Sequence, residues 1–227
     1  MGAVEPPQTE EEIDLEALLE APEEQTESDC TVREDFQDDP EAETGAPPRP
    51  AQPLAAPCLR EFDADKRSGT RPLSAIRWIV LHCTQSNSAR SSAQWFANPD
   101  SAGSAHILVD DRECYRTLGN EVIPWGAPGA NKMGWHVEHA GFAEWTRQKW
   151  LSHEETVRRG AFKCAQHAVK FGIPVDLLSD DELRRGRKGF ITHAQCTRVF
   201  GGSHTDPGTN FPFDRFLQLA QNFAAEF

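Results

Sequence analysis

One stretch of the chain, AIRWIVLHC at residues 75–83, restricts the possible folds more than any other. Apolar side chains occupy almost every position, so a strand formed here is apolar on both of its faces. Strands of this kind lie in the middle of a sheet that is covered on both sides. The stretch therefore predicts a central buried strand with His82 near its end, inside a folded domain that we place at residues 71–227.

Residues 1–70 have the composition of a disordered tail. The first sixty residues hold seventeen of the 36 acidic residues, only three of the 23 basic residues, and nine of the sixteen prolines. Such a segment buries too little apolar area to offset the entropy lost on ordering. Within it, the segment TEEEIDLEALLEA, which starts at Thr9, has a candidate N-cap and leucines near helical spacing. This segment is either a partner-induced helix or a charged segment without a partner.

Charge and composition exclude several classes of protein. Because the acid excess belongs to the tail, the rest of the chain is nearly neutral and lacks the basic excess of a nucleic-acid-binding protein. The first residues do not resemble a secretory signal, and no run approaches the roughly 20 apolar residues that span a membrane. The six cysteines are scattered, with no C-x-x-C pair, which predicts free and mostly buried thiols. We expect a chain made in the cytoplasm, without membrane insertion.

The pattern after residue 83 alternates between helices and strands. SSAQWFANP predicts a short helix capped by Ser91 or Ser92, and GWHVEHAG predicts a strand. SAHILVDDRECYRTL predicts two strands around a polar turn. A long helix is expected from a cap at Ser152 to Phe171, and a last helix in PFDRFLQLAQNFAAEF. Interleaved elements with a hairpin predict an α/β fold, with a mixed central sheet flanked by helices.

Histidines and carboxylates at strand ends and in loops are candidates for chemistry. His82 ends the hydrophobic strand, His193 follows the short run GFIT, and His204 and Asp206 lie in a loop rich in glycine and proline. Two imidazoles and a carboxylate from separate segments match the ligand set of a catalytic zinc site. Each histidine alone is more often hydrogen-bonded in a core than bound to metal.

The spacing of His204 and Asp206 gives further information. Proline disfavours helical geometry in the residue before it, and in an extended segment residues i and i+2 face the same side. If Asp206 binds a metal, His204 lies beside it and can donate a proton or a hydrogen bond to a developing oxyanion. Direct ligation by His204 is the competing assignment. Glu138 is a candidate base for an attacking water, and an exposed strand carboxylate is the alternative.

Five motifs, in this order, resemble those of a known family: IRWIVLHCTQS, SAHILVDD, NKMGWHVEHAG, ITHAQCTRVFGGSHTDPG and FPFDRF. Together they resemble the zinc-dependent N-acetylmuramoyl-L-alanine amidases of the amidase-2 and peptidoglycan-recognition superfamily. They look most like the amidase domains of endolysins from actinobacterial phages. The resemblance spans about residues 74–223 and implies hydrolysis of the amide between the muramic acid lactyl group and the L-alanine of the stem peptide.

The resemblance also implies a role for individual residues. His82, His193 and Asp206 match the zinc ligands, and Glu138 matches the glutamate that polarises or deprotonates the attacking water. His204 stands where many relatives have a lysine that stabilises the oxyanion, so its protonation is expected to matter. The residues implied as substrate contacts are His106, Trp125 and Asn131; for His106 a buried hydrogen-bonded role is the alternative.

The expected function is that of a phage endolysin with Zn²⁺ as cofactor and bacterial peptidoglycan as partner, acting as a monomer. Such an enzyme stays in the host cytoplasm until another protein opens the membrane, and then reaches the cell wall. Two other functions remain open at this point. One is a peptidoglycan-recognition module without catalysis, and the other is a zinc peptidase that cuts within the stem peptide.

Overall fold

The computed structural model describes residues 50–227. The expected tail up to residue 49, including the segment from Thr9 and Cys30, lies outside the described residues. The described strands are β1 (Arg67–Thr70), β2 (Trp78–Cys83), β3 (Ile107–Val109), β4 (Cys114–Arg116), β5 (Val122–Pro124), β6 (Gly134–His139) and β7 (Gly189–Thr192). The helices are η1 (Leu73–Ala75, 3-10), α3 (Ala89–Phe96), α4 (Arg147–Ser152), α5 (Glu154–Phe171), α6 (Asp180–Arg184), α7 (His193–Phe200) and α8 (Phe213–Ala224).

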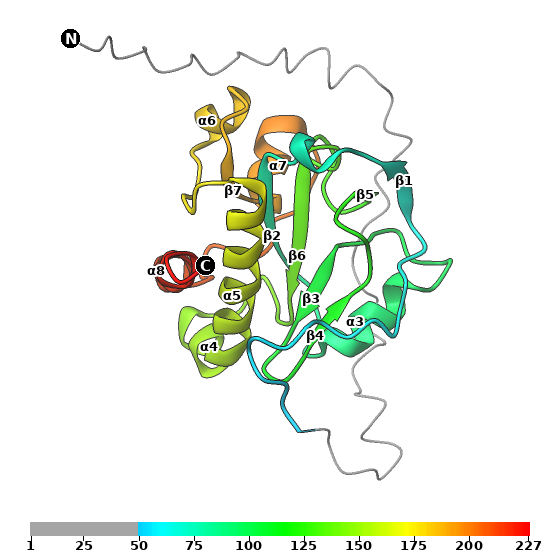
Figure 1. Ribbon diagram of the computed structural model, residues 1–227, viewed down its shortest axis with the longest axis vertical. Coiled ribbons are helices and arrows are strands. Elements are labelled where there is room, and N and C mark those ends of the chain that lie inside the picture. Colours follow the sequence, from blue (N-terminus) through cyan, green and yellow to red (C-terminus); the bar gives the residue numbers. More distant parts are fainter. Residues whose placement is uncertain (1–49) are drawn as a thin grey trace, which may run out of the picture.

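Five strands form a mixed sheet in the order β4-β3-β6-β2-β7, and β1 pairs with β5 in a separate two-stranded sheet (Figure 1). Strands β3, β6, β2 and β7 are parallel, whereas β4 runs antiparallel to β3. The strand expected at residues 75–83 lies between β6 and β7, and all six residues of β2 are buried. The α/β fold with a mixed central sheet flanked by helices is therefore confirmed.

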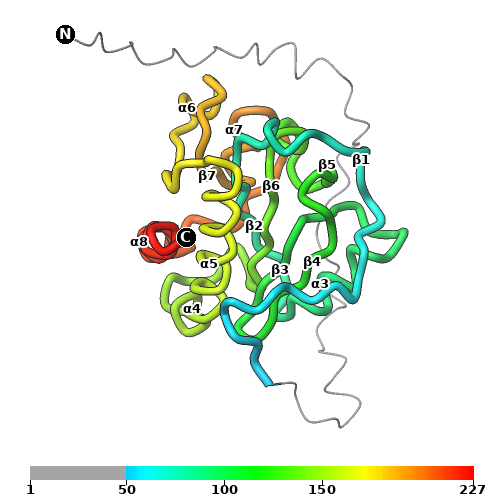
Figure 2. Tube along the Cα trace, in the orientation of Figure 1, coloured from blue at the N-terminus to red at the C-terminus, as the bar shows by residue number. Residues whose placement is uncertain are grey.

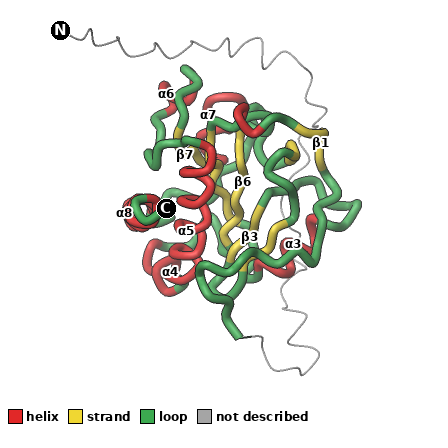
Figure 3. The backbone as a smooth tube through the Cα atoms, viewed as in Figure 1, coloured by secondary structure: helices red, strands yellow, loops and turns green. Residues whose placement is uncertain are grey.

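Different helices pack against the two faces of the five-stranded sheet (Figure 3). One face carries Ile79, Leu81 and Val137, which pack in the cluster that α5 and α8 complete. The other face is covered in two separate places. Around Val80 it packs with residues of α6 and α7, and around Leu108 it packs with residues of α3. Because successive side chains of a strand point to opposite faces, His82 shares the second face with Val80.

Two helix starts differ from the sequence expectation. Helix α3 begins at Ala89 with Ser88 as its cap, and Ser91 and Ser92 are buried inside the helix. Ser152 is the last residue of α4, and α5 starts after His153. At the start of α5 the Asp111 carboxylate accepts a hydrogen bond from the Thr156 backbone N–H at 2.9 Å. A carboxylate from a distant turn thus takes the place of the local cap.

Residues 50–70, which were expected in the disordered tail, pack along the β4 edge of the domain; their trace runs below β3 and β4 and rises to β1 (Figure 2). We call this segment the strap. The Leu59 N–H donates to the Cys114 carbonyl at 2.7 Å, and the Arg116 N–H donates to the Leu59 carbonyl at 2.8 Å. The packed chain thus begins about twenty residues before the expected boundary at residue 71.

The cysteine prediction needs a correction. Cys58 of the strap forms a disulfide with Cys114 of β4, a pairing that links positions 56 residues apart. Cys83, Cys164 and Cys196 are free and buried, as expected. The disulfide was missed because the strap was assigned to the tail, so that Cys58 had no neighbour.

None of the helices formed by residues 50–227 combines the length and the hydropathy required to cross a lipid bilayer.

Candidate metal centre and active site

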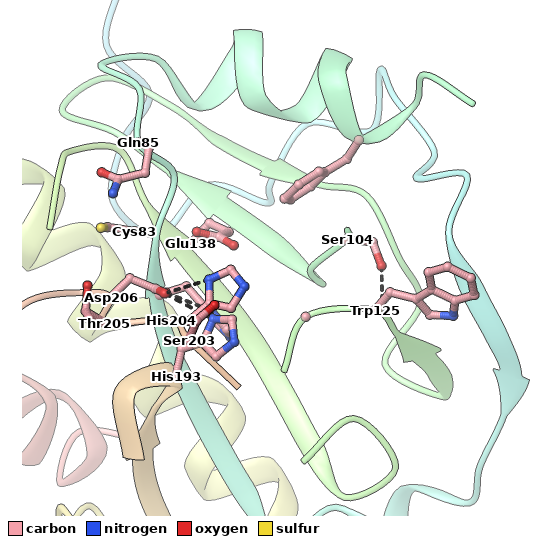
Figure 4. Close-up of a pocket in the computed structure, with 13 residues that line it drawn as sticks. Cys83, Gln85, Ser104, Trp125, Glu138, His193, Ser203, His204, Thr205 and Asp206 are labelled. Atoms are coloured by element: carbon pink, nitrogen blue, oxygen red, sulfur yellow. Dashed lines mark hydrogen bonds and ion pairs between the residues drawn. The ribbon is translucent and has the colours of Figure 1, made fainter. Parts of the chain in front are cut away.

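Three side chains from separate segments converge on one point (Figure 4). His82 comes from β2, His193 is the first residue of α7, and Asp206 lies in the loop between α7 and α8. Nδ1 of His82 is 3.1 Å from Nδ1 of His193 and 3.0 Å from Oδ2 of Asp206. Nδ1 of His193 is 3.1 Å from Oδ1 of Asp206. All three residues are buried, and the two ring nitrogens face each other and one carboxylate oxygen of Asp206 each at nearly equal distances.

These distances fit a zinc ion. In a tetrahedral site with ligand distances of 2.0–2.2 Å, the ligand atoms lie about 3.3–3.6 Å from one another, slightly more than the 3.0–3.1 Å between these donor atoms. Burial lowers the pKa of His82 to about 4, so its imidazole is neutral at pH 7. Although burial opposes it, the neighbouring His193 and His82 rings hold the pKa of the Asp206 carboxyl well below its usual range. Neutral imidazoles and an ionised carboxylate are the states that metal binding requires.

Glu138 lies beside this donor cluster. It stands on β6 opposite His82 in the parallel register, and its side chain lines the same pocket. Its Oε2 atom is buried and has no hydrogen-bond partner within the part of the chain that the structure describes. Burial, and then the nearby Asp206 charge, raise the pKa of this carboxyl well above its usual range. A carboxyl of this kind can hold a proton near neutral pH and exchange it with a molecule in the pocket.

His204 lies in the pocket but is farther from the three donors. Its Nδ1 is 3.7 Å from Oδ1 of Asp206, and its ring stacks on the His193 ring with 4.1 Å between centroids. Its side chain is 25% exposed, compared with 5% for His193. The His204 and Asp206 side chains both line the pocket, and the Asp206–Pro207 peptide bond is cis.

The pocket opens between the two separately covered areas of the second sheet face. Its lining comes from β2, from β6 and from α3, α7 and the loops that flank them. Residues 203–206 and His193 form one wall, and Ser104 and Trp125 face them across the opening (Figure 4). Several lining residues were not predicted from the sequence; they are Cys83, Gln85, Phe96, Ser104, Gly126, Ser203 and Thr205. Their residue types carry no chemical signature, and only the fold brings them to the pocket.

The three residues expected to contact substrate occupy different places. Trp125 lines the pocket, and its indole N–H donates to Ser68 Oγ of the strap at 2.6 Å. His106 is fully buried and does not line the pocket. Asn131 is also buried, and its side-chain oxygen accepts from the backbone N–H groups of Gly126 and Ala127 at 2.9 and 2.8 Å. The positions of His106 and Asn131 favour a framework role, because their polar atoms already contact protein groups.

His136, two residues before Glu138 on β6, was not among the site residues expected from the sequence, but it contacts the donor cluster directly. Nδ1 of His136 is 3.0 Å from Nε2 of His82, on the side of the His82 ring that faces away from Asp206. Burial lowers the pKa of His136 well below its usual value, with the neighbouring His82 as the next cause. His136 is therefore a neutral imidazole at pH 7.

Comparison with known proteins agrees with this fold. The sequence profile of one family, Amidase_2, described as N-acetylmuramoyl-L-alanine amidase, matches residues 72–209. No curated protein matches the chain.

Solved structures with the same fold include the Staphylococcus aureus hydrolase AmiA in complex with its ligand. It is 19% identical, with a TM-score of 0.60 over 75% of this chain and 84% of AmiA. The catalytic domain of XlyA is 17% identical, with a TM-score of 0.51 over 73% of this chain and 99% of that domain. A mutant endolysin from Bacillus subtilis is 16% identical, with a TM-score of 0.50 over 72% of this chain and 98% of the endolysin. At these identities the likeness establishes the fold alone.

Proposed function

The chain belongs to the N-acetylmuramoyl-L-alanine amidase family, and from this premise we propose that it is a zinc-dependent peptidoglycan hydrolase of the endolysin type. The bond cleaved is the amide between the lactyl group of N-acetylmuramic acid and the L-alanine of the stem peptide. One observation carries the proposal, namely that the three donors of His82, His193 and Asp206 lie beside the buried carboxyl of Glu138 in one pocket.

His82, His193 and Asp206 would hold the zinc, which when bound polarises a carbonyl and lowers the pKa of water to about 7. The remaining chemistry falls to two side chains. Glu138 takes the proton of the attacking water, because its raised pKa allows the carboxyl to keep that proton. It then delivers the proton to the leaving amine of L-alanine.

His204 stabilises the oxyanion that forms on the scissile carbonyl. Its ring is held against His193 and remains partly exposed to the pocket, so it can reach a substrate oxygen. An imidazolium donates a stronger hydrogen bond to an oxyanion than a neutral ring does. Residues 203–206 on one wall and Trp125 on the other limit how the glycan strand and its stem peptide can lie in the pocket.

An endolysin of this kind acts as a monomer on the cell wall. It is made in the cytoplasm of the infected host, and another protein opens the membrane before it reaches peptidoglycan. This part of the proposal rests on the motif resemblance to the endolysins of actinobacterial phages.

Product analysis tests the function. The full chain is incubated with zinc and purified actinobacterial peptidoglycan, and soluble products are analysed by mass spectrometry. We expect stem peptides with new L-alanine amino termini and glycan strands with free lactyl carboxylates. The matched control is Glu138→Gln, which preserves the shape of the side chain and should release these products roughly 10³-fold more slowly.

Three other results would contradict the proposal. New reducing ends would indicate cleavage of the glycan, and shortened stem peptides would indicate a peptidase. Binding to peptidoglycan without any product, in protein that carries stoichiometric zinc, would indicate a recognition module.

A further inference from the structure

The His82 ring is contacted on two opposite sides. Its Nδ1 atom faces Asp206 and His193, and its Nε2 atom lies 3.0 Å from Nδ1 of His136. The backbone carbonyl of His82 is also bonded, to Nδ1 of His139 at 3.0 Å. Both ring nitrogens and the main chain of this donor thus have specific partners.

The proton positions follow from these contacts. A neutral imidazole has one N–H and one lone pair. For Nδ1 of His82 to offer a lone pair toward Asp206 and His193, the single proton must be on Nε2. That N–H then points at Nδ1 of His136, which accepts it, so the proton of His136 must be on its own Nε2 atom. The geometry allows only this assignment when His82 acts as a donor to a cation through Nδ1.

We infer that His136 is a positioning residue for the metal centre, accepting the Nε2–H of His82 and so keeping Nδ1 of His82 unprotonated and aimed at His193 and Asp206. The inference rests on the zinc site proposed above. Partners of this kind fix the tautomer and the orientation of a ligating imidazole and raise its basicity. In most such sites the partner is a carboxylate, a carbonyl or water, whereas here it is a second imidazole.

The surroundings of His136 are shaped to hold its ring. A Cβ atom added at Gly126 would lie 2.4 Å from Nδ1 of His136, and one added at Gly134 would lie 2.7 Å from its Nε2. Any side chain at either glycine would collide with the imidazole. The two glycines therefore leave the space that the ring needs in its present orientation.

The backbone of His136 is also held by His106, the residue just before the neighbouring strand β3. The His136 N–H donates to Nδ1 of His106 at 3.0 Å, and the His106 N–H donates to the His136 carbonyl at 3.1 Å. Nε2 of His106 lies 3.1 Å from the Val122 carbonyl, which can accept only if the His106 proton is on Nε2. The tautomer of His106 is thus determined in the same way, and it supports the strand position of His136.

A purely structural role does not explain why position 136 holds a histidine instead of an apolar residue. Nε2 of His136 is buried and has no hydrogen-bond partner within residues 50–227. A buried N–H without a partner destabilises a fold, and an apolar side chain of similar size would avoid that cost. A histidine here therefore serves the bond on its other nitrogen, the one to His82.

Zinc affinity is the first test, measured on the full chain by competition with a chromophoric chelator. His136→Leu removes the acceptor, and we expect zinc to bind roughly 10- to 100-fold more weakly. His136→Asn places an amide oxygen close to the position of Nδ1 and should restore most of the affinity. His167→Leu is the matched control, because His167 stacks on Trp135 and bonds the Lys163 carbonyl without touching His82.

The second test is a nitrogen NMR spectrum of the histidine rings in the zinc-loaded wild-type chain, which does not depend on how any variant folds. We expect the proton of His82 on Nε2. A proton on Nδ1, or wild-type zinc affinity in a folded His136→Leu variant, would overturn the role of His136 alone. Wild-type protein that binds no zinc would instead overturn the proposed metal centre and this role with it.

Discussion

The site end of the sheet and the β4 edge are held together in different ways. At the site end, side chains from β2, α7 and the following loop contact each other directly through nitrogen and oxygen atoms. At the β4 edge, most of the hydrogen bonds that hold the strap are made by its main chain. Lys163 donates to the Ala56 carbonyl at 2.6 Å, and Arg159 donates to the Gln52 carbonyl at 3.0 Å. The first region is specified by side-chain chemistry and the second by backbone position.

This difference separates activity from stability. Polar groups that converge in a pocket mostly serve ligand binding and catalysis, whereas backbone contacts and a disulfide serve the fold. The two regions meet in one place, because Ser68 of the strap accepts the indole N–H of Trp125 in the pocket wall. We therefore expect changes at the site end to abolish turnover in folded protein, and changes at the strap to weaken the fold without altering turnover per folded molecule.

The largest effect is expected for Asp206→Ala. Removing the only anionic donor of the cluster should abolish stoichiometric zinc binding, and the loss of several kcal/mol of charge stabilisation corresponds to a rate reduction on the order of 10⁴-fold. Zinc content by atomic spectroscopy and peptidoglycan turnover measure both effects.

His204→Ala is the matched control for Asp206→Ala, since both side chains line the same loop wall. It should keep zinc and lose roughly 10²-fold in rate, as expected for one oxyanion donor. Loss of zinc in the His204 variant would instead assign His204 as a ligand.

Glu138→Gln is expected to have the next largest effect. The amide has almost the same shape as the carboxyl but cannot take a proton from water, so the rate should fall roughly 10³-fold. Zinc content should be unchanged, because Glu138 is not one of the three convergent donors. A Glu138→Gln variant with full turnover would show that another group accepts the proton.

At the β4 edge, Cys58→Ala in the strap should lower the stability of the fold. The disulfide to Cys114 closes a long loop, and opening it should lower the free energy of unfolding by about 4 kcal/mol. Urea denaturation without reductant measures this change, and wild-type protein in reductant should show the same loss. Turnover per folded molecule should stay at the wild-type level.

Two results would contradict the separation of the two regions. Equal stability of Cys58→Ala and wild-type protein would show that backbone contacts alone hold the strap. A fall in turnover at unchanged stability would show that the strap acts on the pocket, through Ser68 and Trp125.

The same difference explains what could be predicted from the sequence. The central strand could be predicted from its continuous apolar sequence, because every residue of β2 is buried, and the mixed sheet from the interleaved strand and helix patterns. The donors His82, His193 and Asp206 could be identified because their types and motif order carry chemical meaning. The packing of the strap could not be predicted. It depends on backbone carbonyls such as that of Ala56, which every residue has, so no residue type in the sequence indicates these contacts. The role of His136 could be predicted only in part. Its residue type is visible in the sequence, but its contact with His82 depends on the register between β2 and β6.

The smallest expected effect concerns the pH dependence of stability at His167, which lies on α5, the helix that also holds the strap. Burial lowers the pKa of His167 to about 4, whereas an unfolded histidine titrates near 6.5. Between these values the unfolded chain binds a proton that the folded chain does not, so this residue makes the fold less stable as pH falls from 6.5 toward 4. The contribution at pH 5 is about 2 kcal/mol.

His167→Leu removes it, so the stability difference between wild type and variant should shift by that amount in favour of the variant between pH 7 and pH 5. Urea denaturation at both pH values, with and without zinc, measures the shift. A shift that depends on zinc would link His167 to the site end of the sheet, whereas one that is independent of zinc would keep the two regions separate.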